Sequence, residues 1–358
     1  MLLIYISKLG EKMGVAIGPL VEDCKKRIEL SEFKGKKFGF DAYNMLYQFV
    51  TTIRGIDGEP LKNEKGEITS HYSGIFYRIS NVLSYGIKPV FVYDGKSHEL
   101  KNKTKQERRD RRAEAKEKHE KAILEEDIEN MNKFARQSAT IDSKIIEESK
   151  ELLEAMGVPC FTAPGEAEAQ ISYMTSVGQT DYCVSQDFDC LLFGSPNLLK
   201  NIGASGKKKV PFKKVYIDVY PYILESQQVF SKLNITREKL IWMSMLIGTD
   251  FNNKVEGIGP KTALKLVQEN NSFEDILKQL KEKNKEIDFD YHEILDIFKN
   301  PDIEKNPIYD KPLFERQKIE HILLDKANFD EKRTINYLNE FEKKRNEVDK
   351  QKTLSKWF

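Results

Sequence analysis

Three short apolar runs that each end in aspartate constrain the fold of this chain most. They are residues 37–41 (KFGFD), 88–94 (KPVFVYD) and 182–187 (YCVSQD). Helical patterns lie between them, for example over residues 43–53 and 144–156. Strands that alternate with helices predict an α/β fold with a mostly parallel sheet. Because such sheets bind ligands beyond the carboxyl ends of their strands, Asp41, Asp94 and Asp187 are candidate site residues.

The composition narrows the class of protein. The chain has 358 residues, of which 39% are apolar, so it can bury a real core, and its formal net charge is only +1. Any nucleic-acid-binding surface must therefore come from local segregation of charge. The four cysteines form no CxxC pair, which argues against a zinc site or a disulfide framework. No apolar run approaches the roughly 18 residues of a membrane span, and residues 1–12 lack the features of a secretory signal, so we expect an intracellular protein without a membrane partner.

Seven acidic residues stand out by position, and several follow an apolar run and precede a small or turn residue. In the segment from Asp187 to Asp189 the two carboxylates are two positions apart, which places them on the same side of an extended backbone. Glu166 and Glu168 follow Ala163-Pro164-Gly165, a pattern typical of a helix start, and on a helix this spacing makes them diverge. The seven are Asp41, Asp94, Glu166, Glu168, Asp187, Asp189 and Asp250.

A cluster of carboxylates is costly unless something neutralises it, because like charges raise each other's pKa. A hard divalent cation relieves this repulsion, and Mg²⁺ prefers oxygen ligands while it keeps several waters. Two such ions about 3.5–4 Å apart can activate the attacking water and stabilise the leaving oxygen of a phosphodiester. The carboxylate pattern therefore predicts a site for two Mg²⁺ ions that is suited to phosphodiester hydrolysis.

The motifs around these carboxylates closely resemble those of the flap endonucleases, which belong to the five-prime nuclease superfamily and share a Rossmann-like nuclease core. The resemblance runs from Met13 to Phe358 and includes FDAYN, FVYDGK, APGEAEAQ, SQDFDCLLFG and IGTDFN. It implies that all seven carboxylates serve two Mg²⁺ ions, with Asp41 acting largely through water. The ion served mainly by Asp189 and Asp250 is distinct from the one served mainly by Asp94, Glu166, Glu168 and Asp187.

Residues 96–121 carry eleven Lys or Arg against six Asp or Glu, and no Pro or Gly interrupts residues 96–146. We expect one or two long, exposed helices there. The stretch resembles the helical arch through which the family threads a single-stranded five-prime flap, a task for which a basic groove is suited. The resemblance implies that Lys101 and Arg108 steer and neutralise the scissile phosphate. It also implies that Tyr47 stacks on the base beside the cut and that Arg54 contacts DNA.

The sequence Gly257-Ile258-Gly259-Pro260-Lys261 predicts a turn that opens a helix. Its glycines would let backbone N–H groups approach a phosphate at the positive end of the helix. The turn resembles the helix-two-turn-helix with which the family grips the downstream duplex and binds a monovalent cation, usually K⁺. The resemblance thus implies DNA contacts at Gly257, Gly259 and Lys261, with K⁺ as a further cofactor.

The last eight residues fit the pattern Q-x-x-aliphatic-x-x-aromatic-aromatic. This pattern resembles the short motif that docks onto the replication sliding clamp, and it implies that Gln351, Leu354, Trp357 and Phe358 bind the clamp. We expect the protein itself to be a monomer. Residues 1–12 have no counterpart in the family, and a misassigned start and an added segment are both open.

The resemblance divides the chain into five segments. They are a nuclease region with the start of the arch (13–119), the rest of the arch with a connecting helix (120–153), an internal nuclease region (154–240), the helix-two-turn-helix with a C-terminal helical region (241–345), and the clamp-binding tail (351–358). Within the C-terminal helical region, we expect a final amphipathic helix over residues 329–344.

These observations predict a flap endonuclease of the archaeal type, with five-prime exonuclease activity, that acts in Okazaki fragment maturation and base excision repair. We expect it in the cytoplasm, associated with the nucleoid and bound to branched DNA. One rival is a metal-dependent phosphatase on a similar sheet, but Asp41-Ala42-Tyr43 does not supply the DxD-type loop that it needs. A second rival is an inactive DNA-binding or clamp-binding scaffold, which would be expected to have lost some of the seven carboxylates.

Overall fold

The computed structural model describes residues 15–55, 58–125, 127–203, 206–209 and 216–354. The chain divides into two compact units, each assembled from three separate stretches of sequence. Unit 1 consists of residues 1–28, 94–109 and 163–305, and unit 2 consists of residues 29–93, 110–162 and 306–358. Helix α5 (Lys101–Leu124) begins in unit 1 and ends in unit 2.

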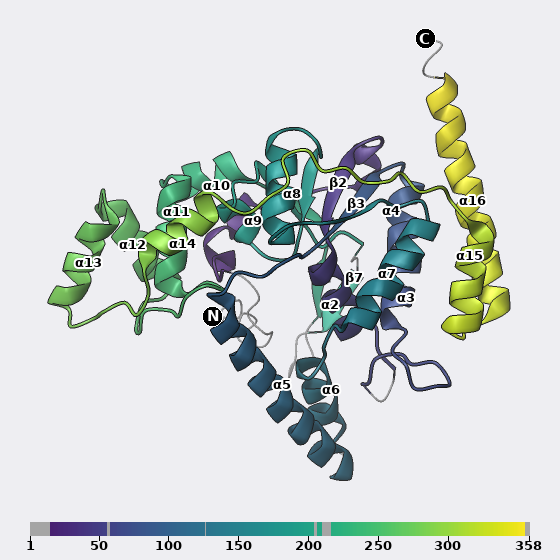
Figure 1. Cartoon of the computed structure of the whole chain (residues 1–358), viewed down its shortest axis with the longest axis horizontal. Coiled ribbons are helices and arrows are strands. Elements are labelled where there is room, and N and C mark those ends of the chain that lie inside the picture. The colour runs from purple at the N-terminus through teal and green to yellow at the C-terminus, as the bar shows by residue number, and fades with distance from the viewer. Residues whose placement is uncertain (1–14, 56–57, 126, 204–205, 210–215, 355–358) are drawn as a thin grey trace. The chain divides into compact units, whose positions relative to one another are not determined.

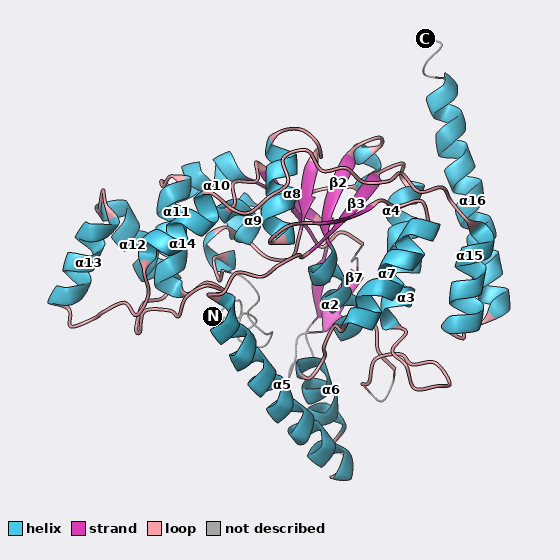
Figure 2. Cartoon of the chain, in the orientation of Figure 1, coloured by secondary structure: helices cyan, strands magenta, loops and turns pink. Residues whose placement is uncertain are grey.

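Unit 2 contains three parallel strands in the order β2-β3-β4. Phe40 on β2 is paired in register with Phe91 on β3, and their rings stack with centroids 5.0 Å apart. Both side chains are fully buried, as expected for parallel strands that run through a core. Figure 2 shows β2 and β3 side by side. The strands are β2 (Lys37–Asp41), β3 (Lys88–Tyr93) and β4 (Cys160–Thr162).

Helices pack on these strands, α2 and α4 against β3 and α7 against β4. Gly74 lets α3 approach α2 closely, because a Cβ at this position would lie 2.2 Å from Cγ of Phe49. The predicted helices over residues 43–53 and 144–156 are confirmed as α2 and α7. The helices are α2 (Ala42–Thr52), α3 (Ser70–Gly74), α4 (Ser80–Ser84), α6 (Ile128–Gln137), α7 (Ser143–Ala155), α15 (Arg316–His321) and α16 (Glu331–Leu354), with the short turns η3 (Leu30–Phe33), η4 (Ile75–Ile79) and η5 (Ile322–Lys326).

The part of α5 that belongs to unit 2 forms a helical hairpin with α6 (Figure 1). The Nδ1 atom of His119 on α5 lies 3.0 Å from the carbonyl oxygen of Met131 on α6. Asp127 caps α6 by accepting the N–H of Asn130 at 3.1 Å. Only Ala115, His119 and Ala122 of α5 are buried, so the prediction of long, exposed helices in this stretch is confirmed.

Helix α16 is longer than the sequence suggested. It begins at Glu331 and continues past the predicted end at Lys344 to Leu354. Tyr337 anchors it, because its ring packs 5.1 Å from Phe76 and 4.8 Å from Tyr77. The extension could not be predicted from an apolar pattern, since the segment after Arg345 is dominated by polar residues.

Four of the six strands described in unit 1 lie side by side in the order β1-β9-β6-β5. β5 and β6 are parallel, with Val184 paired to Leu199, whereas β9 is antiparallel to β6 and β1. Leu198, Leu199 and Leu224 are fully buried and form the centre of this sheet. The strands are β1 (Lys26–Arg27), β5 (Tyr182–Val184), β6 (Asn197–Lys200) and β9 (Tyr222–Glu225), and β7 (Gly206–Lys209) pairs antiparallel with β8 (Tyr216–Val219).

The helices of unit 1 centre on α11, whose residues 240–247 are all buried. α12 and α14 pack against it. The predicted helix after the glycine-rich turn is confirmed, because Gly259 caps α12 and Pro260 is its first residue. The helices are α8 (Ala167–Ser176), α9 (Asp189–Leu192), α10 (Ser226–Leu233), α11 (Arg237–Ile247), α12 (Pro260–Glu269), α13 (Phe273–Glu282) and α14 (Tyr291–Lys299), with the turns η1 (Gly18–Leu20) and η2 (Glu22–Cys24).

The fold class is the α/β class that the sequence predicted. All four cysteines are free, and Cys24, Cys183 and Cys190 are buried. Across the described part of the chain, no helix combines the length and the apolar character that crossing a membrane requires.

Candidate active site

The seven candidate carboxylates are divided between the two units. Asp41 belongs to unit 2, and the other six belong to unit 1. Asp41 is 6% exposed, and its Oδ1 atom accepts the N–H of Asn44 at 3.0 Å. This bond satisfies one of the free N–H groups at the start of α2, so Asp41 serves as a helix cap in addition to any role at a site.

Asp94 is held against the first turn of α8. Its Oδ1 atom accepts the N–H of Ala167 at 2.8 Å, at the positive end of the helix. Gly95 makes this approach possible, because a Cβ there would lie 1.9 Å from the carbonyl oxygen of Ala163. The N–H of Gly95 also donates to the carbonyl of Gly165 at 2.8 Å, which fixes Asp94 beside the start of α8.

Glu166 and Glu168 diverge, as expected for residues two positions apart at a helix start. Glu166 is the N-cap residue of α8 and makes an ion pair with Lys101. Glu168 accepts the hydroxyl of Ser185 at 2.7 Å, and its Oε1 atom lies 3.8 Å from the thiol of Cys190. Burial raises the pKa of Glu166, and the ammonium of Lys101 opposes that shift.

The segment from Asp187 to Asp189 is not extended, and the expectation that an extended backbone aligns the two carboxylates is wrong. Phe188 has φ −91° and ψ −3°, and Asp189 begins α9. Asp189 is 5% exposed, and its Oδ1 atom accepts the N–H of Val15 at 2.9 Å. Burial raises the pKa of Asp189 to about 7, and the charges of Asp250 and Asp187 add to the shift. The two carboxylates therefore still act on each other through charge.

Lys101 and Arg108 bring positive charge to these carboxylates. The ammonium of Lys101 contacts Glu166 and lies 3.8 Å from Oδ2 of Asp250, and Nη2 of Arg108 lies 2.6 Å from Oδ1 of Asp250. Thr104, between them on the same face of α5, donates its hydroxyl to the backbone carbonyl of Asp250 at 3.0 Å. Burial disfavours the charged form of Lys101, but Glu166 and Asp250 outweigh it and raise the pKa of Lys101.

The donor chemistry of unit 1 fits a hard divalent cation. Carboxylate oxygens are the ligands that Mg²⁺ prefers. Burial is the largest cause of the raised pKa of Asp189, and the negative charges of Asp250 and Asp187, which a cation would relieve, add to it. Within the described residues, no three side chains of His, Cys, Asp or Glu are grouped closely enough to form a ready metal site. In this state the positive charge beside the carboxylates is supplied by Lys101 and Arg108.

The sequence analysis missed Lys200, the last residue of β6. Its side chain is 5% exposed, and its Nζ atom lies 3.5 Å from the ring centroid of Phe188. Burial lowers the pKa of Lys200 to about 8, and the negative charge of Asp187 is the largest effect in the opposite direction. Ser185 and Val15, which hold Glu168 and Asp189, were missed as well. No local pattern marks any of the three, although a lysine that ends an apolar run such as 197–200 is a weak signal.

Tyr47 and Arg54 belong to unit 2. The guanidinium of Arg112 on α5 lies over the Tyr47 ring, 5.9 Å from its centroid. Arg54 donates to the carbonyl oxygens of Thr51 at 3.1 Å and Gly58 at 2.7 Å, and burial lowers its pKa to about 10. In this structure Arg54 therefore stabilises its own loop.

The glycine-rich turn has the geometry that its glycines allow. Gly257 has φ +70°, in the left-handed region that favours glycine. Lys261 lies exposed in the first turn of α12. Lys285 contributes a second positive charge here, because its Nζ atom donates to the carbonyl of Glu256 at 2.5 Å. The turn thus carries both backbone N–H groups and local positive charge.

The predicted clamp-binding tail and the N-terminal segment include residues that the structure does not describe. Trp357 and Phe358, like residues 1–12, lie outside the described residues. The side chains of Gln351 and Leu354 also lie outside them, although the backbone from 351 to 354 is the end of α16.

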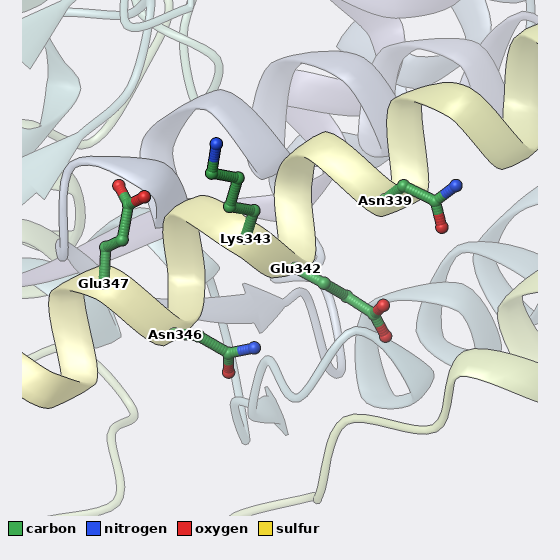
Figure 3. A pocket seen from close by; sticks show the side chains of 5 residues that line it. All are labelled: Asn339, Glu342, Lys343, Asn346 and Glu347. Carbon is green, nitrogen blue, oxygen red and sulfur yellow. The ribbon is translucent and has the colours of Figure 1, made fainter.

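A shallow hollow on α16 is not a candidate active site (Figure 3). Its lining residues all come from this one helix, with Lys343 and Glu347 on one side of it and the others pointing elsewhere. A binding site normally combines an apolar enclosure with polar groups that converge on a ligand, and this hollow has neither. The lining residues are Asn339, Glu342, Lys343, Asn346 and Glu347.

The sequence matches two regions of a known nuclease family. Residues 13–115 match the XPG N-terminal domain, and residues 157–250 match the XPG I-region. In fold, the chain is similar to the catalytic core of Rad2 solved in complex with DNA substrate, with a TM-score of 0.68 and 22% identity over 92% of this chain and 100% of that one. The two matched regions, together with the acidic centre, define a nuclease of the XPG type.

Full-length relatives narrow the family further. Flap endonuclease 1 of Sulfolobus acidocaldarius is 41% identical over 348 residues, which is 96% of this chain and 99% of the relative. Flap endonuclease 1 of Pyrococcus furiosus is 41% identical over 349 residues, 97% of this chain and 99% of the relative. The solved flap endonuclease-1 from Methanococcus jannaschii superposes with a TM-score of 0.71 at 36% identity, covering 94% of this chain and all of that one. The chain belongs to the flap endonuclease family.

Proposed function

We propose that this nuclease cuts branched DNA at the junction of a five-prime flap, depends on Mg²⁺, and also degrades DNA from a five-prime end. The observation that carries the proposal is the acidic centre of unit 1, where Glu166 and Asp250 contact Lys101 and Arg108 from the start of α5. Hydrolysis of a phosphodiester needs both kinds of charge. Carboxylates hold metal ions, and fixed cations stabilise the charge that develops on the phosphate.

Two Mg²⁺ ions are the proposed cofactors. When bound, they would activate the attacking water and stabilise the leaving oxygen. The role of the protein is to position the metal ligands. Hydrogen bonds from Ala167, Ser185 and Val15 already position Asp94, Glu168 and Asp189. The proposed ligands are Asp94, Glu166, Glu168 and Asp187 for one ion, Asp189 and Asp250 for the other, and Asp41 through water.

The proposed path of the single-stranded flap runs along α5 and α6, the helical arch. Lys101 and Arg108 would exchange their carboxylate partners for the scissile phosphate, because a guanidinium pairs with phosphate as well as with carboxylate. Tyr47, whose ring is covered by Arg112 here, would stack on the base beside the cut. Arg54 would add a contact to the DNA.

The remaining proposals concern partners. Gly257, Gly259 and Lys261 would hold the backbone of the downstream duplex, with K⁺ at the same turn. The tail at residues 351–358 would dock onto the replication sliding clamp, and the enzyme itself would act as a monomer in the cytoplasm, on the DNA of the nucleoid. We propose the roles in Okazaki fragment maturation and base excision repair on the same basis, the resemblance of the motifs.

The experiment that tests the function compares cleavage of matched flap, single-stranded and blunt duplex substrates, with and without Mg²⁺. We expect cleavage of the flap at the junction, only with metal, and its loss in Asp187→Ala with flap binding largely intact. A phosphatase would instead release phosphate from a phosphomonoester, and a scaffold would bind the flap without cutting it. Normal magnesium-dependent cleavage by Asp187→Ala would contradict the proposed centre.

A further inference from the structure

Lys200 is a charged side chain in the interior of unit 1. It is 5% exposed, and burying an ammonium without compensation is costly. β6 and β5 are parallel neighbours, with Val184 paired to Leu199. Lys200 at the carboxyl end of β6 therefore lies at the same edge of the sheet as the segment that leaves β5 and carries Asp187 and Asp189.

The ammonium of Lys200 lies over the ring of Phe188. The Nζ atom of Lys200 lies 3.5 Å from the ring centroid, a distance at which the face of an aromatic ring attracts a cation. The ring also packs against the N-terminal segment, because a Cβ at Gly18 would lie 3.6 Å from a carbon of its edge. Phe188 stands between the two acidic residues, so whatever fixes the ring also fixes the backbone that carries both carboxylates.

The N-terminal segment holds the same loop by a second contact. The N–H of Val15 donates to Oδ1 of Asp189 at 2.9 Å, and the N–H of Asp187 donates to Oγ of Ser185 at 3.1 Å. These bonds orient one carboxylate and one backbone group. Neither holds the Phe188 ring from the side of β6, so Lys200 supplies a restraint that the hydrogen bonds do not.

We propose that Lys200 is a positioning residue of the acidic centre. Its buried ammonium, seated on the face of Phe188, holds the segment from Asp187 to Asp189 in the conformation that binds divalent cations. The inference rests on the proposed metal dependence, and it adds that a positive charge inside the protein is required to build a site for positive ions.

The sign of the effect separates positioning from simple electrostatics. A lysine near carboxylates repels an incoming cation, so removing its charge should tighten Mg²⁺ binding if charge were its only effect. If Lys200 positions the loop, removing its charge weakens Mg²⁺ binding, because the carboxylates must then be ordered by the metal itself. A desolvated contact between a cation and a ring is strong enough to change affinity by about tenfold or more.

The experiment measures Mg²⁺ binding to the full chain by calorimetry, after metal is removed with a chelator. We expect Lys200→Met to weaken binding by about tenfold and Lys200→Arg to retain it within about threefold, since Arg also stacks on aromatic rings. Phe188→Leu should weaken binding to a similar extent. The double variant should then be no weaker than either single variant by more than about threefold, because both changes remove the same contact.

Lys25→Met is the matched control. Lys25 also lies over an aromatic ring in unit 1, with Nζ 4.9 Å from the centroid of Tyr222, and it pairs with Glu22. It should leave Mg²⁺ affinity within about twofold. Thermal unfolding of each variant checks that it is folded. If Lys200→Met does not fold, the Mg²⁺ affinities of Phe188→Leu and Lys200→Arg still test the inference.

Two results would overturn the inference. Unchanged or tighter Mg²⁺ binding by Lys200→Met, or additive effects of the Lys200 and Phe188 substitutions, would show that the lysine does not act through the ring. If the unaltered chain binds no Mg²⁺, the proposed metal dependence fails together with this inference. Binding by the unaltered chain without a loss in Lys200→Met overturns this inference alone.

Discussion

Replacing Lys101 with Met removes an ammonium from the acidic centre while it keeps a side chain of similar length. The ammonium contacts Glu166, lies 3.8 Å from Asp250 and lies 5.0 Å from the centroid of the Phe251 ring. The side chains of Lys101 and Glu166 are 16% and 18% exposed, so water compensates little for the lost charge. Breaking a buried ion pair costs about 3–5 kcal/mol, and the remaining exposure lowers our expectation to about 2–3 kcal/mol.

The assay is urea unfolding of Lys101→Met and the unaltered chain, first with a chelator and then with saturating Mg²⁺. The variant should lose about 2–3 kcal/mol of unfolding free energy in the chelator, and Mg²⁺ should restore a large part of it, because the metal replaces the missing positive charge. Lys105→Met is the control, since Lys105 lies exposed on the same helix and donates to Ser97 at 2.5 Å. A loss below about 0.5 kcal/mol in the chelator would refute the reasoning.

Three further predictions follow from other parts of the chain. Burial together with Asp250 and Asp187 raises the pKa of Asp189 from 3.8 to about 7, so the folded metal-free protein binds this proton more tightly than the unfolded chain. Its unfolding free energy should therefore fall as pH rises from about 4 to about 7 and then level off, a trend that Asp189→Asn should remove in thermal unfolding at a series of pH values. Affinity for flap DNA should fall steeply with salt, and Lys261→Ala should reduce the slope of log affinity against log salt by about 1. Replacing Trp357 and Phe358 with Ala should abolish binding to the cognate sliding clamp in a pull-down while clamp-free flap cleavage stays unchanged, and retained clamp binding would place the contact elsewhere.

The sequence predicted those structural features that depend on residues close together in the chain. An apolar run followed by an acid and then a helical pattern placed Asp41 at the start of α2, and Ala163-Pro164-Gly165 marked the start of α8. The divergence of Glu166 and Glu168 was also predictable, because side chains two positions apart on a helix face different directions. In each case the local backbone decides the outcome.

The partners of the carboxylates could not be predicted in the same way. Asp189 is held by Val15 and Glu168 by Ser185, and the first of these pairs is separated by 174 residues. The extended geometry expected around Phe188 was wrong because α9 starts at Asp189, a four-residue helix too short to leave a periodic pattern. Lys200 was missed for a related reason, since a lysine at the end of a strand is usually exposed and only the packing of unit 1 buries it.

Metal binding in unit 1 is expected to be an exchange of partners, because Glu166 and Asp250 are already paired with Lys101 and Arg108. A phosphate that draws these two cations away frees both carboxylates for metal at the same time. DNA and Mg²⁺ should therefore bind with positive coupling, and each should tighten the other by the same factor. The measurement is Mg²⁺ affinity with and without a flap DNA whose junction linkage cannot be cleaved.

The variant Lys101→Met separates this exchange from the general attraction of Mg²⁺ to DNA. It leaves Glu166 unpaired before DNA arrives, so its Mg²⁺ affinity without DNA should rise and the gain on adding DNA should shrink. An equal gain in the variant and the unaltered chain would mean that the phosphates attract the metal directly, and that the ion pair of Lys101 plays no part in the coupling.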